Sequence, residues 1–179
     1  MKRLSVNVIM VLIMSLLFTS CFSLYDGYSG GTVKCKINIT SNHPKEKMDA
    51  ISFSAYGSAY SNSFVSGFYV NNKSDQRVFI EWENARCNFG KVVFSDDRRI
   101  TMNNPKADEA VSAHSLSISR DFTSMNNIGD DDVYPLYNVK DLKNGKTKSV
   151  FLIIPIRYTD GSVEEYRLTL TYSWEEKQQ

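Results

Sequence analysis

The chain has 179 residues, of which 42% are hydrophobic and 12% aromatic, and its formal net charge is +1 at pH 7. This content favours a folded domain over a disordered chain. The near-neutral charge lacks the electrostatic footprint of a nucleic-acid-binding protein, so no nucleic-acid partner is expected. The length suits one domain with a core of its own, and plentiful Val, Ile, Thr, Tyr and Phe favour strands.

The first twenty residues have the layout of a secretory signal peptide. Two cations, Lys2 and Arg3, precede a mostly apolar run over residues 6–18, and the small residues Thr19 and Ser20 follow it. A transmembrane helix is one alternative, although it needs about 20 apolar residues. An ordinary cleaved signal is the other alternative. Removal of residues 1–20 changes the formal charge to about −1.

Directly after the small residues comes Cys21, within the run LFTSC. This run resembles the lipobox of bacterial lipoproteins, with Phe18 where that family usually has Leu. The resemblance implies cleavage before Cys21, acylation of that residue and a membrane partner reached through the lipid anchor. An Asp after the cysteine tends to hold such proteins at the inner membrane. Phe22 stands there instead, so the resemblance favours the outer membrane.

Residues 21–32 follow as the lipidated cysteine and a flexible tether rich in Gly, Ser and Tyr. The domain is predicted over residues 33–179. It opens on the clearest strand signal, residues 33–40, in which apolar and polar side chains alternate with a period of two. A polar turn containing Pro44 ends this strand.

Further alternating segments, separated by turn residues, predict most of the remaining strands. They are residues 51–58, 64–70, 78–83, 89–95, 98–102, 114–120, 149–158 and 163–174. In residues 114–120, Leu116 and Ile118 are expected to face inward. The last two strands form a hairpin across Asp160-Gly161, a favoured pair for a tight turn.

No window of the mature chain has a convincing helical period. Eight or nine short strands at regular spacing therefore predict an all-β, antiparallel, immunoglobulin-like β-sandwich, with a small barrel as the alternative. The runs VNNKSDQRVFIEWENARC and LKNGKTKSVFLIIPIRYTDGSVEEYRLTLTY loosely resemble immunoglobulin-like lipoproteins of unknown function. That resemblance implies a fold and a compartment, and it carries no activity.

The two cysteines of the domain are Cys35 and Cys87. An even pair in an oxidising envelope predicts a disulfide, and two buried free thiols are the alternative. A metal site needs more ligands than the isolated His43 and His114 supply, so neither a metal nor a cofactor is expected.

Several patterns that suggest catalysis or ion binding have simpler structural interpretations. Ser29 lies in a G-x-S-x-G match without the strand and helix that this motif needs. Residues 130–132 are three aspartates, which suit calcium or a solvated turn. Glu81 and Glu83 are two residues apart in a predicted strand, a spacing compatible with a glycosidase pair. His114 is a candidate base without an identified partner. No enzymatic activity is therefore predicted.

Two stretches are candidate contact surfaces. Residues 53–69 mix Tyr and Phe with Ser and Gly, a composition typical of adaptable binding loops and equally of core packing. The irregular stretch 121–138 is long enough to suggest function, although its apolar residues can also pin the loop to the domain. Its candidate contact residues are Phe122, Met125, Ile128, Tyr134 and Tyr137.

The sequence thus predicts a lipid-anchored cell-envelope protein whose non-catalytic domain binds another envelope macromolecule, a protein or a glycan. One alternative is a structural or assembly accessory lipoprotein. The other is an envelope hydrolase that uses His114 or a carboxylate pair.

Overall fold

The computed structural model describes residues 31–40, 45–59, 62–95, 102–103, 107–127 and 134–176. The chain divides into two compact units, one of Met1–Gly31 with Glu176–Gln179 and one of Thr32–Glu175. The second unit holds the described strands and helices, apart from the first residue of the first strand and the last residue of the last strand. The predicted signal peptide, Cys21 and almost all of the tether lie outside the described residues.

Strands dominate the described part of the chain. They are β1 (Gly31–Ile39), β2 (Ile51–Tyr56), β3 (Val65–Asn72), β4 (Val78–Ile80), β5 (Arg86–Cys87), β6 (Gly90–Ser95), β7 (Met102–Asn103), β8 (Glu109–Val111), β9 (Ser115–Leu116), β10 (Arg120–Ser124), β11 (Lys148–Tyr158) and β12 (Val163–Glu176). The helical elements are short: α2 (Lys45–Ala50), α3 (Val139–Lys143) and the 3-10 turns η2 (Trp82–Asn84) and η3 (Met125–Asn127). None of these helices is long and apolar enough to cross a membrane.

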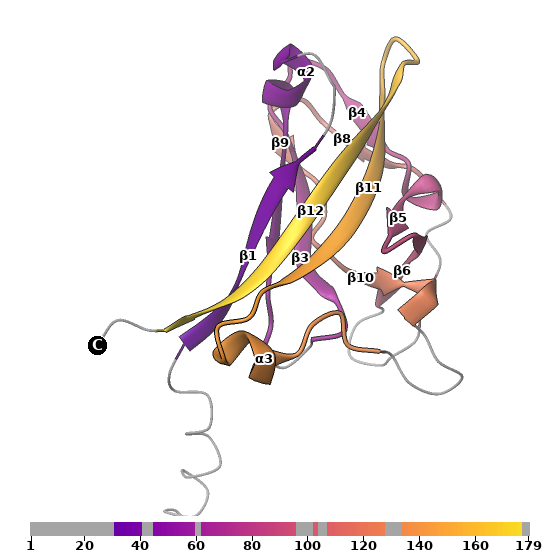
Figure 1. The fold of residues 1–179 in the computed structure, drawn as a ribbon. Coiled ribbons are helices and arrows are strands. Elements are labelled where there is room, and N and C mark those ends of the chain that lie inside the picture. Colours follow the sequence, from indigo (N-terminus) through magenta and orange to yellow (C-terminus); the bar gives the residue numbers. More distant parts are fainter. Residues whose placement is uncertain are drawn as a thin grey trace, which may run out of the picture. The chain divides into compact units, whose positions relative to one another are not determined.

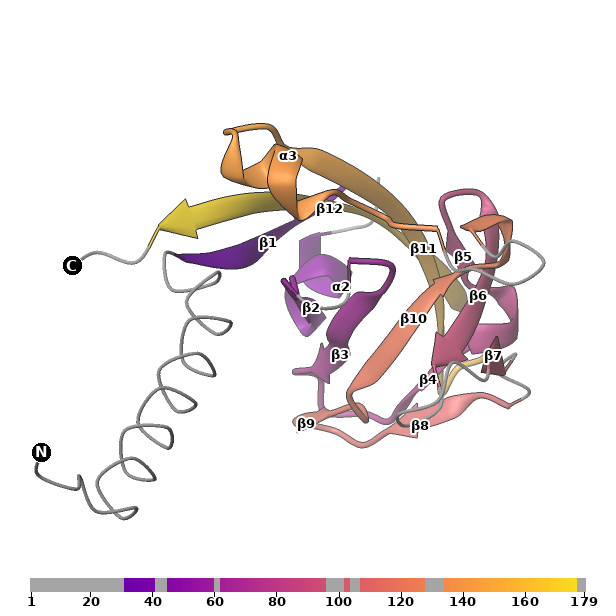
Figure 2. The same cartoon turned by 90° about the horizontal axis from the view of Figure 1, so that it is seen from below.

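The strands form one curled sheet (Figures 1 and 2). Its main path is β1-β12-β11-β5-β6-β10-β3-β2, with β4, β7, β8 and β9 attached beside it. Every strand pair with a resolved register is antiparallel. The predicted all-β, antiparallel fold is confirmed, with twelve strands where eight or nine were expected. The immunoglobulin-like arrangement stays a prediction.

The β11–β12 hairpin is the longest element and follows the predicted pattern. Its register runs from Lys148 opposite Tyr172 to Arg157 opposite Val163. The even-numbered residues from Val150 to Tyr158 and from Tyr166 to Tyr172 are buried against the core. Their odd-numbered neighbours face the other side because side chains alternate along a strand. Gly161 supplies the positive φ that the tight turn requires.

The core of the curled sheet contains a cluster of aromatic rings. Phe68, Phe94 and Phe122 surround Trp82, with ring centroids 5.1–6.2 Å from the indole. The Trp82 Nε1 donates a hydrogen bond of 2.9 Å to the Glu109 carboxylate. The buried indole therefore has its donor satisfied, as buried polar groups require.

Two predicted strands end earlier than their alternation suggested. The segment predicted over residues 78–83 leaves the sheet after Ile80, where η2 begins and turns Trp82 into the core. In the segment predicted over residues 114–120, Ser115–Leu116 pairs with β3, residues 117–119 belong to no strand, and Arg120 begins β10. Leu116 and Ile118 are exposed, so the prediction that they face inward is wrong.

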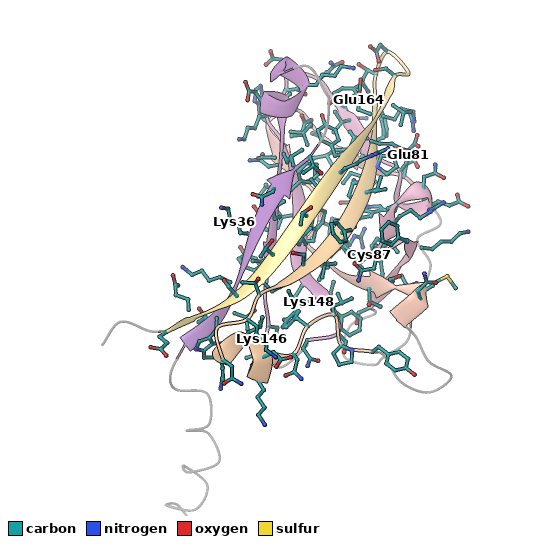
Figure 3. The ribbon with its side chains drawn as sticks, viewed as in Figure 1. Lys36, Glu81, Cys87, Lys146, Lys148 and Glu164 are labelled. Carbon is teal, nitrogen blue, oxygen red and sulfur yellow. The ribbon has the colours of Figure 1, made fainter. Side chains whose placement is uncertain are left out.

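The predicted disulfide is also wrong, because Cys35 and Cys87 are free thiols. Cys35 lies on β1 and Cys87 on β5, and the sheet order places β12 and β11 between them. Three strand spacings amount to about 14 Å along the sheet, whereas bridged Cα atoms lie within about 7 Å. Cys87 is wholly buried. Lys36, which follows Cys35 on β1, is exposed, and its side chain points away from the sheet (Figure 3).

Candidate functional site

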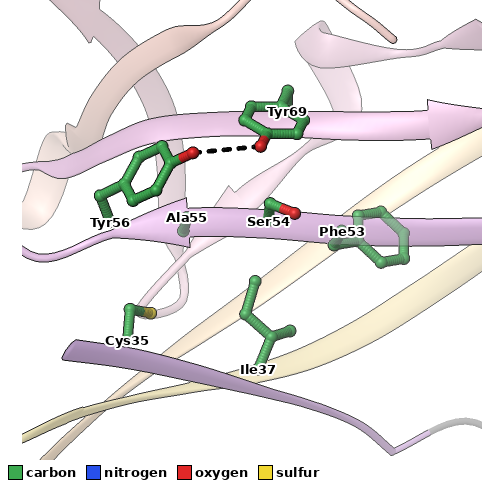
Figure 4. Close-up of a pocket in the computed structure, with 7 residues that line it drawn as sticks. All are labelled: Cys35, Ile37, Phe53, Ser54, Ala55, Tyr56 and Tyr69. Atoms are coloured by element: carbon green, nitrogen blue, oxygen red, sulfur yellow. Dashed lines mark hydrogen bonds between the residues drawn. The ribbon is translucent and has the colours of Figure 1, made fainter. Parts of the chain in front are cut away.

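An open pocket of about 300 Å³ lies between β1 and β2, the two strands at the ends of the sheet path. Seven residues from β1, β2 and β3 line it: Cys35, Ile37, Phe53, Ser54, Ala55, Tyr56 and Tyr69 (Figure 4). None of the seven is an Asp, Glu, Lys, Arg or His. The pocket therefore suits an uncharged group, and both hydroxyl groups and apolar side chains line it.

The two end strands meet at one end of this seam, where Gly57 follows β2. A Cβ added at Gly57 would lie 2.1 Å from Cγ1 of Val33 on β1. Only glycine permits this close approach. Farther along, Cys35 and Ile37 of β1 face Ala55 and Phe53 of β2 across the pocket (Figure 4).

The pairing between β2 and β3 is irregular beside the pocket. Ser54 pairs with Tyr69, but Tyr56 pairs with Ser66, so the register against β3 changes between these two positions. Between these pairs β3 advances by three residues and β2 by two, so the extra residue lies on β3. A bulge of this kind bends the strand that contains it, and here it lies beside Ser54 and Tyr56 of the pocket.

Two tyrosines form the polar edge of the pocket. The hydroxyl oxygens of Tyr56 and Tyr69 lie 3.1 Å apart, within hydrogen-bonding distance. This hydrogen bond raises the pKa of Tyr56 and, together with one from Ser54, lowers the pKa of Tyr69. Gly67 has φ of +55°, and a Cβ there would lie 2.3 Å from the Tyr56 ring, so this glycine leaves room for the ring.

Beneath the pocket, Cys35 adjoins a pair of buried tyrosines. The rings of Tyr137 and Tyr172 stack with centroids 4.4 Å apart. The Tyr137 hydroxyl donates to the Ser58 carbonyl and accepts from the Ser58 amide, each at 2.7 Å. The buried Tyr172 hydroxyl has no hydrogen-bond partner of regular geometry among the described residues, and burial together with the neighbouring Cys35 thiol raises its pKa.

The predicted contact residues of the stretch 121–138 differ in their burial. Phe122 and Tyr137 are core residues, so their prediction as contact residues is wrong. Their rings pack against Phe68 and Tyr172, which fixes the ends of the stretch to the sheet. Met125 and Tyr134 are exposed. Ile128 lies outside the described residues.

The stretch 53–69 contains both of its predicted alternatives. Phe68 is buried in the aromatic core, whereas Tyr56 and Tyr69 line the pocket. The Tyr- and Ser-rich composition was the sequence signal for this site. The other side of the pocket is formed by Cys35 and Ile37 of β1. For these two residues the sequence indicated only an alternating strand.

The candidate catalytic groups lie apart and have other contacts. His114 Nε2 lies 2.8 Å from Asp75 Oδ1 at an exposed turn. Glu81 accepts a hydrogen bond of 3.1 Å from Arg157, and Glu83 belongs to η2 rather than to a strand. Ser29, His43 and residues 130–132 lie outside the described residues. Within the described ranges, no three potential metal ligands gather at one place.

Comparisons with models of protein families, with curated proteins and with solved structures find no match to this chain.

Proposed function

We propose that the chain is a lipid-anchored cell-envelope protein, acylated at Cys21, whose β-sheet domain binds an extended segment of another envelope protein without catalysing a reaction. The lipobox-like run LFTSC supports the anchor, since two or more acyl chains provide lasting membrane attachment. Phe22 favours the outer membrane as the location.

The observation that carries the binding proposal is the position of the pocket at the two ends of the sheet path. β1 is bonded to β12 alone along this path, and β2 to β3 alone. An end strand offers backbone groups with which an extended peptide can pair, and a neighbouring pocket selects one of its side chains. The uncharged lining favours an uncharged side chain in the pocket.

Metabolic labelling with radioactive palmitate tests the anchor. We expect the label to enter the wild-type chain and to be lost in Cys21→Ser. Cys35→Ser is the matched control, because it removes another thiol and should leave labelling unchanged. Equal labelling of wild type and Cys21→Ser would contradict the anchor.

Photo-crosslinking in intact cells tests the pocket. Benzoylphenylalanine is placed in turn at Tyr56, Leu116 and Tyr134, which are 57%, 58% and 59% exposed. We expect a discrete crosslinked protein at position 56 and none at the control position 116. Crosslinking at position 134 alone would instead favour the predicted contact stretch, and a glycan adduct at position 56 would replace the protein partner by a sugar. Without any adduct at position 56, the pocket proposal fails.

A further inference from the structure

The β5–β6 hairpin has an unusual tip. Cys87 pairs with Gly90, so the loop consists of Asn88 and Phe89, whose φ angles are +48° and +67°. Such turns favour Asn and Gly, because other residues are strained at positive φ. Asn88 has a structural role, since its amide donates to the Phe151 carbonyl and its side chain accepts from the Phe151 amide.

Phe89 has no comparable role in the fold. Its side chain is 86% exposed, and its ring lies 6.2 Å from that of Phe151, which is itself 50% exposed on β11. Both the strained backbone at this position and the exposure of an apolar ring to solvent are unfavourable for folding. Observed strain of this kind justifies a search for a function at the same place.

Cations lie beside this aromatic pair on the outer face of the sheet. The register places Arg167 opposite Ile153, Ile153 opposite Arg86, and Arg86 opposite Lys91, a row that crosses four strands. In this row, Ile153 is two residues after Phe151 on β11, and Lys91 is two residues after Phe89. Like charges directly opposite each other are unfavourable in a sheet.

The cations of this row are only partly neutralised by the described residues. The Arg86 guanidinium donates to the backbone carbonyls of Glu83 and Ala85. Arg167 lies 3.6 Å from the Glu165 carboxylate in an exposed pair, which contributes little in water. No ion pair joins Lys91 to another described residue. Positive charge and exposed aromatic rings therefore coincide at one face.

We propose that this face, made of Phe89, Phe151, Arg86, Lys91 and Arg167, docks on an anionic phospholipid bilayer. The two rings enter the boundary between headgroups and acyl chains, and the cations lie among the phosphates. A bilayer fits better than an acidic protein, because the most exposed ring lies in a hairpin loop with solvent around most of its surface. Its insertion needs no complementary cavity in the partner.

The inference goes beyond the anchor and the pocket, and it rests on neither. An acylated Cys21 would favour docking, because the eleven residues from there to Thr32 reach roughly 36 Å when extended. Docking would then hold the domain against the membrane surface in one orientation.

The test uses the full chain with an indole reporter, in Phe89→Trp. The chain is mixed with vesicles of phosphatidylcholine, with and without phosphatidylglycerol. With phosphatidylglycerol we expect the reporter emission to shift to the blue, to be quenched by brominated lipid and to be shielded from acrylamide. Leu116→Trp, at a position of 58% exposure on β9, is the matched control and should show none of these effects.

Loss of charge should weaken docking by about fivefold for each cation removed. Lys91→Gln with Arg167→Gln is therefore expected to lower the docked fraction strongly, whereas Lys140→Gln on α3 should leave it unchanged. Added salt should act in the same direction as the double substitution.

Two results would overturn the inference. One is a reporter at position 89 that remains open to acrylamide while the chain floats with anionic vesicles. The other is equal quenching at positions 89 and 116. Failure of the chain to float with phosphatidylcholine vesicles would count against the anchor alone, so the two proposals are tested separately.

Discussion

At the scale of single residues, Phe89 is the clearest conflict between local structure and stability. A non-glycine residue at φ of +67° carries a cost of roughly 1–2 kcal/mol relative to ordinary backbone. Solvent surrounds most of its ring, so packing offsets little of that cost. Glycine at this position should therefore increase the stability of the fold, although it removes the ring.

Phe89→Gly is expected to raise the free energy of unfolding by about 1 kcal/mol, measured by urea denaturation with an unchanged m-value. Gly161→Ala is the matched comparison, because Gly161 has φ of +84° with no atom near a new Cβ, and it should lower the stability by a similar amount. A stability loss in Phe89→Gly would mean that the ring supports the hairpin.

The two thiols predict a pH dependence. Burial raises the pKa of Cys35 from 9.0 to about 11 and that of Cys87 from 9.0 to about 12. Folding therefore favours the protonated thiols, and their contribution is fully present below about pH 9. We expect the unfolding free energy to fall as pH rises through the window from 9 to 12.

Thiol labelling tests whether both thiols are buried. At pH 8 both cysteines should react slowly with iodoacetamide in the folded chain and rapidly in urea, because the thiolate is the nucleophile. Cys35, which is half-buried, should react before the wholly buried Cys87. Rapid reaction of both thiols in the folded chain would contradict the burial, and the absence of two free thiols would restore the disulfide.

At the scale of elements, Glu109 connects segments that strand pairing alone does not join. Its carboxylate on β8 accepts from Trp82 Nε1 at 2.9 Å, from the Ile118 amide at 2.7 Å and from Arg120 at 3.2 Å. Only 9% of this side chain is exposed. The carboxylate thus holds η2, β10 and the segment before β10 around the aromatic core.

Glu109→Ala should lower the free energy of unfolding by about 3 kcal/mol, because a buried indole donor and a half-buried guanidinium lose their acceptor. Glu109→Gln, which keeps one acceptor oxygen, should lower it less. The exposed Glu83→Ala is the control with no expected effect. Denaturation midpoints check the order, and equal losses in the alanine and glutamine variants would show that charge alone matters.

At the scale of the whole sheet, the pocket depends on how closely its two ends approach each other. Gly57 touches Val33 at one end of the seam, and the side chains of the pocket separate the strands beyond that point. Gly57→Ala should force the end strands apart, lower the stability by about 2 kcal/mol and reduce crosslinking from position 56. Gly145→Ala, at a turn with open space around it, should reduce stability without affecting crosslinking.

Period-two alternation in the sequence was sufficient to predict an antiparallel all-β domain and its final hairpin, because local periodicity states which residues of a strand share a face. It could not state which strands become neighbours. Curling of the sheet decided that β1 and β2 flank a pocket. The order and register of the strands decided that β1 and β5 are too far apart for a disulfide and that cations from three strands form one row. The burial of Phe122 and the exposure of Met125 depended in the same way on packing between distant segments. Such contacts arise only when the whole chain is folded.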